Sequence, residues 1–299
     1  MNTKSLALLL FCAALFSCES KTEKTMSFTN DIHSFSKPNE AHVTHLSWKA
    51  SVDFDKKIIS AIATWTIAAN ESDSIVLDTK GLNIEKVLLN NEQAATFSLG
   101  SEVAILGQSL SIKTTPNAKS ISIYYTTSPD AEALQWLSPQ QTAGKKFPFL
   151  FTQSEAILAR SWVPCQDSPG VKFTYDADVT VPKDLLALMS ASNPQAKNES
   201  GTYHFEMKQP ISSYLFALAV GDIAFKSVSG RTGVYAEPSV IDTAVWEFID
   251  LEKMVAGAEE LYGAYPWERY DLIVLPPSFP FGGMENPRLT FATPTILTG

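Results

Sequence analysis

The sequence predicts a mainly β protein in which a large β region is followed by a shorter region of mixed α/β type. From Ala41 to Val220, short runs of alternating apolar and polar residues are separated by Asn, Gly, Pro and Asp, as in a large antiparallel β domain. After Ser239, apolar residues instead recur every three or four positions, which indicates an amphipathic helix.

The β region is predicted from runs that alternate with a period of two. In SISIYY, Ile121, Ile123 and Tyr125 share one parity while the serines and Tyr124 share the other, as a half-buried strand requires. The runs of this kind are THLSWKASVDF, IISAIATWTIAA, SIVLDT, IEKVLLN, SISIYYTT, KFTYDADVTVP, GTYHFEMKQP and SYLFALAVGDIAF. We therefore predict one N-terminal β domain over residues 41–222.

The helical pattern is predicted to form one helix that ends at Tyr262. Ser239 and Asp242 fit a capping box at its start, and Gly263 with Pro266 marks its end.

A second domain is predicted over residues 223–299. The helix is followed by YDLIVLPP, which is typical of a strand that enters a loop. A helix and a strand after a long β run indicate the beginning of a mixed domain that this chain leaves incomplete. We therefore expect an apolar helix face and a strand edge of this domain to be exposed.

The N-terminal residues, MNTKSLALLLFCAALFSCES, are predicted to direct export. Lys4 precedes an apolar stretch that is too short to span a bilayer, and Leu15 to Cys18 resembles a bacterial lipobox, in which the cysteine thiol is acylated. Residues 1–17 would be a signal peptide and residues 18–40 a flexible tether. This predicts a lipid-anchored membrane protein of the bacterial cell envelope, periplasmic or at the cell surface. An ordinary signal peptide with an incidental cysteine is the alternative.

The net charge argues against nucleic acid as a partner, and the cysteine count argues against an intrachain disulfide. A net charge of -9 and a pI near 5.0 provide no basic field for nucleic acid or an anionic membrane surface. With Cys12 in the signal peptide and Cys18 lipidated, Cys165 has no partner for an intrachain disulfide. No histidine lies near Cys165 in sequence, so we interpret it as a small buried residue and not as a nucleophile.

The last stretch, PFGGMENPRLTFATPTILTG, indicates a binding function. Gly282 and Gly283 would let another backbone approach a loop or edge strand, and pairing at a strand edge is a common way to hold an extended peptide. Glu285 places a carboxylate beside that edge, where it could bind an ammonium group. Together these residues would hold a peptide by its free N-terminus. A plain turn and a solvated carboxylate are the alternative.

This stretch resembles the Gly-x-Met-Glu-Asn exopeptidase motif of the aminopeptidase N superfamily of zinc metallopeptidases, in its leukotriene A4 hydrolase-like branch. From about Ala41 to the end, further segments resemble that branch in the same order, among them IVLDTKGLNIEKVLLN, ALQWLSPQQTAGK, FLFTQSEAILARSWVPCQDSPGVKFTY and YLFALAVGDI. The resemblance implies a saddle-like N-terminal β domain followed by a thermolysin-like α/β catalytic domain, of which this chain holds the start.

The resemblance also implies roles for individual residues. Glu285 would bind the α-amino group of a peptide substrate, and the backbone of Gly282 and Gly283 would pair with that substrate. Gln153, in FTQSEA, matches the family glutamine that lines the first side-chain pocket beside the amine. The methionine and asparagine of the motif are expected mainly to support the loop. The substrate-binding residues implied in this way are Gln153, Gly282, Gly283, Met284 and Glu285.

The zinc ligands of the family have no match in this chain. The family binds zinc through the histidines of His-Glu-x-x-His on a helix and a later glutamate. None of the four histidines, His33, His42, His45 and His204, forms that motif. His42 and His45 are spaced like a metal pair, but on a strand this spacing sends them to opposite faces. No catalytic residue and no metal ligand is predicted here, and zinc is expected in the complete family enzyme.

Two functions are predicted as alternatives. In the first, the chain is the N-terminal part of an exported zinc aminopeptidase that removes N-terminal residues from peptides. In the second, it is a non-catalytic lipoprotein that binds a peptide or another partner without zinc. The end of the chain before the family's catalytic helix is expected to mark a fragment that is inactive as given. Epoxide hydrolysis is implied only by the resemblance.

Overall fold

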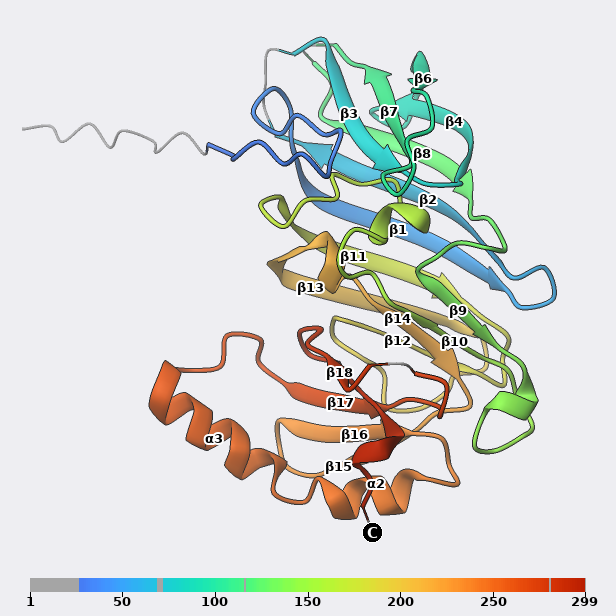
Figure 1. The fold of residues 1–299 in the computed structure, drawn as a ribbon, viewed down its shortest axis with the longest axis vertical. Coiled ribbons are helices and arrows are strands. Elements are labelled where there is room, and N and C mark those ends of the chain that lie inside the picture. The colour runs from blue at the N-terminus through green and yellow to red at the C-terminus, as the bar shows by residue number, and fades with distance from the viewer. Residues whose placement is uncertain (1–26, 69–71, 116, 280, 299) are drawn as a thin grey trace, which may run out of the picture.

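The computed structural model describes residues 27–68, 72–115, 117–279 and 281–298. The predicted signal peptide and the lipidation site Cys18 lie outside these ranges. The described chain is mainly β, as predicted, and its strands form four sheets. In Figure 1 the three-stranded and seven-stranded sheets lie at the top, the four-stranded sheet lies in the middle, and the five-stranded sheet with its helices lies at the bottom.

The seven-stranded sheet has one buried face and one face toward solvent. Its strands are β1 (Val43–Asp53), β2 (Ile58–Ile67), β4 (Asn83–Leu89), β5 (Gln93–Ala94), β8 (Ser120–Thr126), β11 (Lys172–Thr180) and β13 (Thr202–Ser212), in the order β13-β11-β1-β2-β8-β4-β5. Neighbours are antiparallel, as predicted, except β1 and β11, which are parallel. The predicted burial of Ile121, Ile123 and Tyr125 is confirmed, and Tyr124 on the other parity is half-buried. Ser122, predicted on the exposed parity, is buried as well, because its hydroxyl bonds to Thr64 and Asn91.

Two smaller sheets complete the β region. The four-stranded sheet has the order β12-β14-β10-β9, and the three-stranded sheet has the order β3-β7-β6. The strand bounds are β3 (Ser74–Thr79), β6 (Phe97–Leu99), β7 (Gln108–Lys113), β9 (Leu134–Leu137), β10 (Phe149–Thr152), β12 (Leu186–Met189) and β14 (Leu218–Gly221). Between the large sheet and the four-stranded sheet, Trp48 packs edge-on against Trp162 and Phe216, with ring centroids 5.4 and 5.6 Å away. Short 3-10 helices are η1 (Pro139–Gln141), η2 (Ala159–Ser161), η3 (Ser213–Leu215) and η4 (Pro294–Ile296).

A buried ion cluster ties residues before β1 to the core. Arg160 Nε donates to Asp167 Oδ2 at 2.9 Å, and Arg160 Nη1 lies 3.7 Å from Asp78 Oδ1, with all three side chains at most 1% exposed. Arg160 Nη2 donates to the His33 carbonyl at 2.9 Å, and Ser34 Oγ donates to Asp78 Oδ2 at 2.6 Å. The segment with His33 and Ser34, predicted as part of a flexible tether, is therefore fixed to the core. Its polar composition gave no sign of these buried partners.

Cys165 lies beside this cluster and is fully buried, as predicted. The Asp78 amide donates to its carbonyl at 2.7 Å. Burial raises the pKa of the Cys165 thiol well above its ordinary value, so the reactive thiolate is disfavoured. The interpretation of Cys165 as a packing residue is confirmed.

The five-stranded sheet carries the C-terminal residues. Its strands are β15 (Ala224–Ser227), β16 (Thr232–Ala236), β17 (Tyr270–Val274), β18 (Gly283–Met284) and β19 (Thr290–Ala292), in the order β15-β16-β17-β19-β18, and its helices are α2 (Ile241–Glu247) and α3 (Leu251–Tyr262). The three inner strands are parallel and the two outer strands are antiparallel to their neighbours. Two helices between parallel strands give the mixed α/β type that the sequence predicted.

The predicted single helix is two helices, and its predicted cap is wrong. The chain breaks between α2 and α3, where the Leu251 amide donates to the Phe248 carbonyl at 3.0 Å. Ser239 does not cap α2, whose N-terminal boundary has no side-chain cap. The Ile241 amide instead donates to the Glu237 carbonyl at 3.1 Å, because a turn before the helix already supplies an acceptor.

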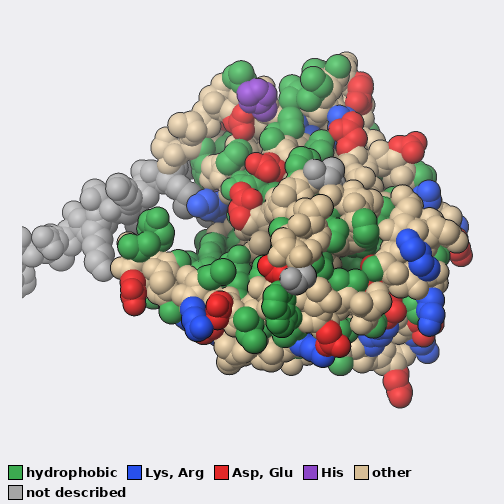
Figure 2. All heavy atoms as spheres, turned by 60° about the horizontal axis from the view of Figure 1, so that its bottom comes forward, with side chains coloured by type: hydrophobic (Ala, Val, Ile, Leu, Met, Phe, Trp, Pro, Cys, Tyr) green, Lys and Arg blue, Asp and Glu red, His purple; other side chains and the backbone are tan. Residues whose placement is uncertain are grey.

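The expected exposure of an apolar helix face is confirmed on α3. Met254, Leu261 and Tyr262 are 64%, 76% and 88% exposed. Figure 2, which views the molecule from this end, shows hydrophobic side chains in small groups among charged ones. The helix ends at Gly263, as predicted, with a φ of +90° that favours glycine. Within the described ranges, no helix combines the length and apolar character needed to cross a membrane.

An ion-pair network holds α3 against the turn before β16. Arg231 donates to Glu259 from Nη1 at 2.8 Å and from Nη2 at 2.7 Å, and from Nε to Glu252 at 2.9 Å. These bonds, with one from the Tyr265 amide, lower the pKa of Glu259 from its ordinary 4.5 to about 2. Since the folded-state pKa is the lower one, the stabilisation is present above pH 4.5 and is lost as pH falls toward about 2.

We expect Glu259→Gln to lower the urea midpoint of unfolding near pH 6, and the difference from the parent chain to shrink near about pH 2.5. Urea unfolding at the two pH values measures this. Glu260→Gln, a substitution at the exposed neighbouring carboxylate, is the control and should have little effect at either pH. A difference that is unchanged on acidification would contradict the role of the Arg231 pairing.

Candidate functional site

Four of the five predicted peptide-binding residues lie on or directly beside the outermost strand of the five-stranded sheet, and the fifth, Gln153, follows β10 of the four-stranded sheet. β18 pairs on one side with β19, through Gly283 with Ala292 and Met284 with Phe291. Its other side has no partner among the described strands, so the predicted strand edge is confirmed. The free backbone groups of such an edge are where an extended peptide can add as a further strand.

The two glycines of this stretch have different surroundings. A Cβ atom on Gly283 would lie 3.2 Å from the Phe291 carbonyl oxygen, so the close approach of β19 favours glycine there. A Cβ atom on Gly282 would meet nothing within 4 Å, and Gly282 is exposed. A second backbone can therefore approach Gly282 from solvent without steric hindrance.

Gln153 is brought to this strand from the end of β10. Its backbone amide donates to the Ala133 carbonyl at 2.9 Å, and its Nε2 donates to Met284 Sδ at 3.4 Å. The Gln153 side-chain oxygen Oε1 is buried and has no hydrogen-bond partner among the described residues. An unpaired buried oxygen is costly, so it marks a position where a donor is missing.

Glu285 directly follows β18 and its side chain is exposed. Its carboxylate can only accept hydrogen bonds, as can the free Gln153 Oε1, and an ammonium group offers three donors. Asn286 is 2% exposed, and its carbonyl accepts from the Leu289 amide at 3.2 Å in the turn that leads to β19. This contact fits the expected role of Asn286 in supporting the loop.

Aromatic rings hold the loop before β18 against β10. Phe279 is 4% exposed, and its ring centroid lies 5.5 Å from that of Phe151 in β10 and 6.4 Å from that of Phe291 in β19. The exposed Phe281 packs on its outer side at 5.9 Å. Phe279 thus helps to set the position of β18 relative to the strand that precedes Gln153. Nothing in the sequence marks Phe279, because an aromatic residue in a proline-rich segment has no periodic context.

Glu237 is another residue that the sequence analysis missed. It lies just after β16 and is 6% exposed, and it accepts from the amides of Ala143 and Gly144 at 2.7 and 2.9 Å. The loop after η1 is thereby joined to the five-stranded sheet. No local signal could have indicated this contact, because Glu237 lies 94 residues from Ala143 and 93 residues from Gly144 in sequence.

The described residues do not fit a zinc ion. Within residues 27–68, 72–115, 117–279 and 281–298, no group of three or more His, Cys, Asp or Glu side chains is arranged to hold a metal. The His42 ring packs 5.0 Å from Phe28. His45 instead bonds to Thr174 at 2.7 Å and to Asp176 at 2.8 Å, so the two histidines do not converge.

Comparison with known protein families shows to which family this chain belongs. Residues 42–215, more than half of the chain, match the Peptidase M1 N-terminal domain. The chain belongs to the M1 peptidase family. The matched part contains Gln153 and the β region except β14, whereas the edge strand followed by Glu285 lies beyond it.

Curated M1 relatives extend the similarity past the matched domain. Leukotriene A-4 hydrolase from Xenopus laevis is 44% identical over 281 residues, which cover 90% of this chain and 46% of the relative. Leucine aminopeptidase 2 from Yarrowia lipolytica is 42% identical over 249 residues, which cover 82% of this chain and 38% of the relative. The chain therefore spans less than half the length of these relatives.

Solved structures share the fold. Yeast LTA4 hydrolase in complex with bestatin superposes with a TM-score of 0.84 at 36% identity, covering 91% of this chain and 43% of the yeast chain. An M1 zinc metallopeptidase from Deinococcus radiodurans superposes with a TM-score of 0.68 at 21% identity, covering 86% of this chain and 61% of that one. The mainly β fold that the resemblance implied is thus confirmed for this M1 chain.

Proposed function

We propose that this chain supplies the substrate-amine recognition of an exported zinc aminopeptidase. One observation carries the proposal: the buried Gln153 meets Met284 at an edge strand that ends in the exposed Glu285, and Gln153 Oε1 has no partner among the described residues. Both groups accept hydrogen bonds from an ammonium group. The name of the Yarrowia relative, a leucine aminopeptidase, supports the same reaction class.

In this proposal a peptide adds to the free edge of β18 in an extended conformation. Backbone pairing at Gly282 and Gly283 places its N-terminus next to Glu285, whose carboxylate binds the α-ammonium group. A peptide with a blocked N-terminus would lose this ion pair, so the arrangement would select for peptides with a free N-terminus. In the complete protein, zinc held by residues outside those described here would supply the activated water.

We expect Glu285→Ala to reduce kcat/KM for an unblocked peptide by roughly 30- to 1000-fold, or about 2 to 4 kcal/mol, in the complete protein that carries this chain. The loss follows because the substrate ammonium keeps its desolvation cost and loses its counter-charge. Steady-state hydrolysis of a tripeptide with a free N-terminus measures the effect.

The matched control is Glu260→Ala, which removes an exposed carboxylate from α3. It should leave turnover unchanged. The same tripeptide with an acetylated N-terminus should be a poor substrate for the parent protein and should lose little further with Glu285→Ala. The proposal would be contradicted if Glu285→Ala lowered kcat/KM equally for the free and the acetylated peptide. It would also be contradicted if the complete protein did not hydrolyse peptides.

The proposal includes export and a lipid anchor at Cys18, which rest on the N-terminal sequence alone. We expect Cys18→Ser to abolish incorporation of labelled palmitate and to release the protein from the membrane fraction of its source cells. Residue Cys12 provides the control, because Cys12→Ser changes a thiol inside the predicted signal peptide and should leave labelling intact. Labelling that survives Cys18→Ser would exclude the anchor.

A further inference from the structure

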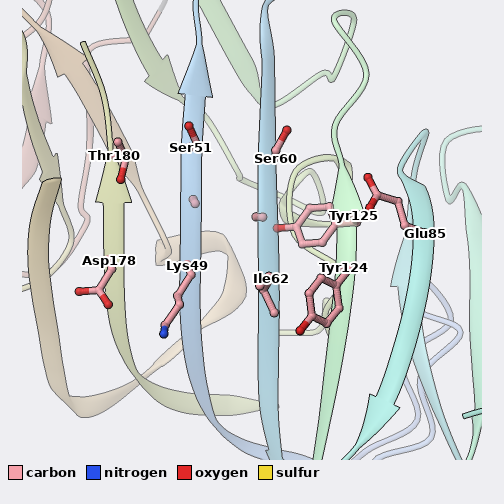
Figure 3. Close-up of a pocket in the computed structure, with 11 residues that line it drawn as sticks. Lys49, Ser51, Ser60, Ile62, Glu85, Tyr124, Tyr125, Asp178 and Thr180 are labelled. Atoms are coloured by element: carbon pink, nitrogen blue, oxygen red, sulfur yellow. The ribbon is translucent and has the colours of Figure 1, made fainter. Parts of the chain in front are cut away.

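A shallow hollow of about 400 Å³ lies on the solvent-facing side of the seven-stranded sheet (Figure 3). It crosses several neighbouring strands toward the end of the sheet at which β1 turns into β2. The side chains that matter for its chemistry are Lys49 and Ser51 from β1, Ser60 and Ile62 from β2, Tyr124 from β8, Glu85 from β4, and Asp178 and Thr180 from β11. Trp48 on the opposite face of β1 is buried in the core, so the hollow and the core lie on opposite sides of one sheet.

The hollow forms where a row of short side chains lies beside a row of longer ones. Ser51 and Ser60 are paired across β1 and β2, so their short side chains leave space above the sheet. In the adjacent row, Lys49 pairs with Ile62 and Ile62 with Tyr124, and these longer side chains form one wall. Figure 3 shows the two rows side by side, with the serines in one and the longer side chains in the other.

Four polar side chains of this hollow are free, whereas Asp178 and Thr180 at its edge bond to His204 and Thr202 of β13. Among the residues that the structure describes, the side chains of Lys49, Ser51, Ser60 and Glu85 make no hydrogen bond or ion pair. Farther along this face, polar side chains bond to one another, for example Thr64 with Ser122 at 2.8 Å. The free donors and acceptors of the hollow are therefore available to a ligand.

The Tyr124 ring adds an accessible aromatic face. It is half-buried, and the ammonium group of the exposed Lys86 lies 4.0 Å from its centroid. The Lys86 side chain covers this face of the ring, and a ligand would have to displace this flexible surface side chain in order to pack there. A ring of this kind can pack against the C–H face of a sugar.

The chemistry of the hollow selects one class of ligand. A peptide strand cannot pair here, because the backbone groups in the middle of a sheet already bond to neighbouring strands. A polyanion is disfavoured by the net charge of -9, and a lipid by the single aliphatic side chain, Ile62, among these groups. Hydroxyls, one ammonium and two carboxylates, of which Glu85 is free and Asp178 is bonded to His204, lie beside an aromatic ring and suit a neutral ligand rich in hydroxyl groups.

We propose that this hollow binds a neutral oligosaccharide. The sugar hydroxyls bond to Ser51, Ser60, Lys49 and Glu85, and one pyranose ring packs on Tyr124 in place of the Lys86 side chain. The site is independent of the amine-recognition site, because Gln153 and Glu285 lie outside the seven-stranded sheet. Binding would attach the protein to a glycan surface without involving the proposed peptide site.

The experiment titrates the full chain with three uncharged hexasaccharides, maltohexaose, cellohexaose and chitohexaose, by isothermal titration calorimetry. We expect saturable binding of at least one of them. Ser60→Leu, which fills the floor, and Tyr124→Ala, which removes the stacking face, should each weaken that binding at least tenfold. Thr66→Leu is the matched control, since it lies on the same face of β2 about 20 Å from Ser60 and should bind as the parent does.

Circular dichroism and urea unfolding establish that each variant is folded before it is titrated. Saturable binding that is lost in Ser60→Leu and Tyr124→Ala but kept in Thr66→Leu supports the proposal. The proposal is overturned if none of the three hexasaccharides binds, if binding is the same in all variants, or if Thr66→Leu weakens it equally. Tighter binding of a pentalysine or pentaglutamate peptide at this hollow would also overturn it.

Discussion

Replacing Arg160 by alanine is expected to lower the free energy of unfolding by about 3 to 5 kcal/mol, the range for removing one partner of a buried ion pair. The Arg160 side chain is 0% exposed, and the carboxylates of Asp167 and Asp78 would remain buried without their cation. The carbonyls of His33 and Leu106 would each lose a donor at 2.9 Å as well. Urea unfolding of the full chain, followed by tryptophan fluorescence, measures the loss.

Two further variants separate the buried cluster from ordinary surface charge. Lys113→Ala breaks an exposed ion pair with Asp73 and should cost less than about 1 kcal/mol. Asp167→Asn combined with Arg160→Ala removes one of the two carboxylates that lose their cation, so the double variant should lose less stability than the sum of the single variants. A cost for Arg160→Ala near that of Lys113→Ala, or strict additivity with Asp167→Asn, would show that the cluster does not hold the core together.

The parts of the fold that the sequence predicted correctly depend on local periodicity. Burial of one sheet face forces a period of two on the strand that carries Ile121, Ile123 and Tyr125, so the pattern is visible in a few consecutive residues. The end of α3 at Gly263 was equally local, since a positive φ favours glycine. The break between α2 and α3 was not predicted, because the apolar spacing continues through it.

The candidate site depends on contacts that the sequence does not contain. Gln153 and Met284 lie 131 residues apart, and only the family resemblance suggested that they belong to one site. Arg160 and Glu237 are charged residues in the core or near it, which composition alone would place at the surface. Their partners are backbone groups and carboxylates from distant segments. Such long-range contacts have no period, and so the residues that hold the site in place were missed.

Replacing Phe279 by alanine is expected to cost about 3 to 5 kcal/mol, the range for truncating a buried phenylalanine. Its ring is 4% exposed and contacts Phe151 and Phe291, which belong to two different sheets. Phe279→Leu keeps most of the volume and should cost less than about 1.5 kcal/mol. Phe281→Ala, at a ring that is 50% exposed, is the control and should cost little.

The loss of stability caused by Phe279→Ala should be concentrated at the candidate site. Amide hydrogen exchange should accelerate for Met284 and Phe291 more than for Trp48 in the middle of the large sheet, because β18 and β19 lose their contact with β10. Since Gln153 follows β10 and Glu285 follows β18, the same loosening would separate the two acceptors that we propose to bind the substrate ammonium. In the complete protein it should therefore raise KM for free peptides, whereas exchange that is uniform across the sheets would mean that the ring serves the core alone.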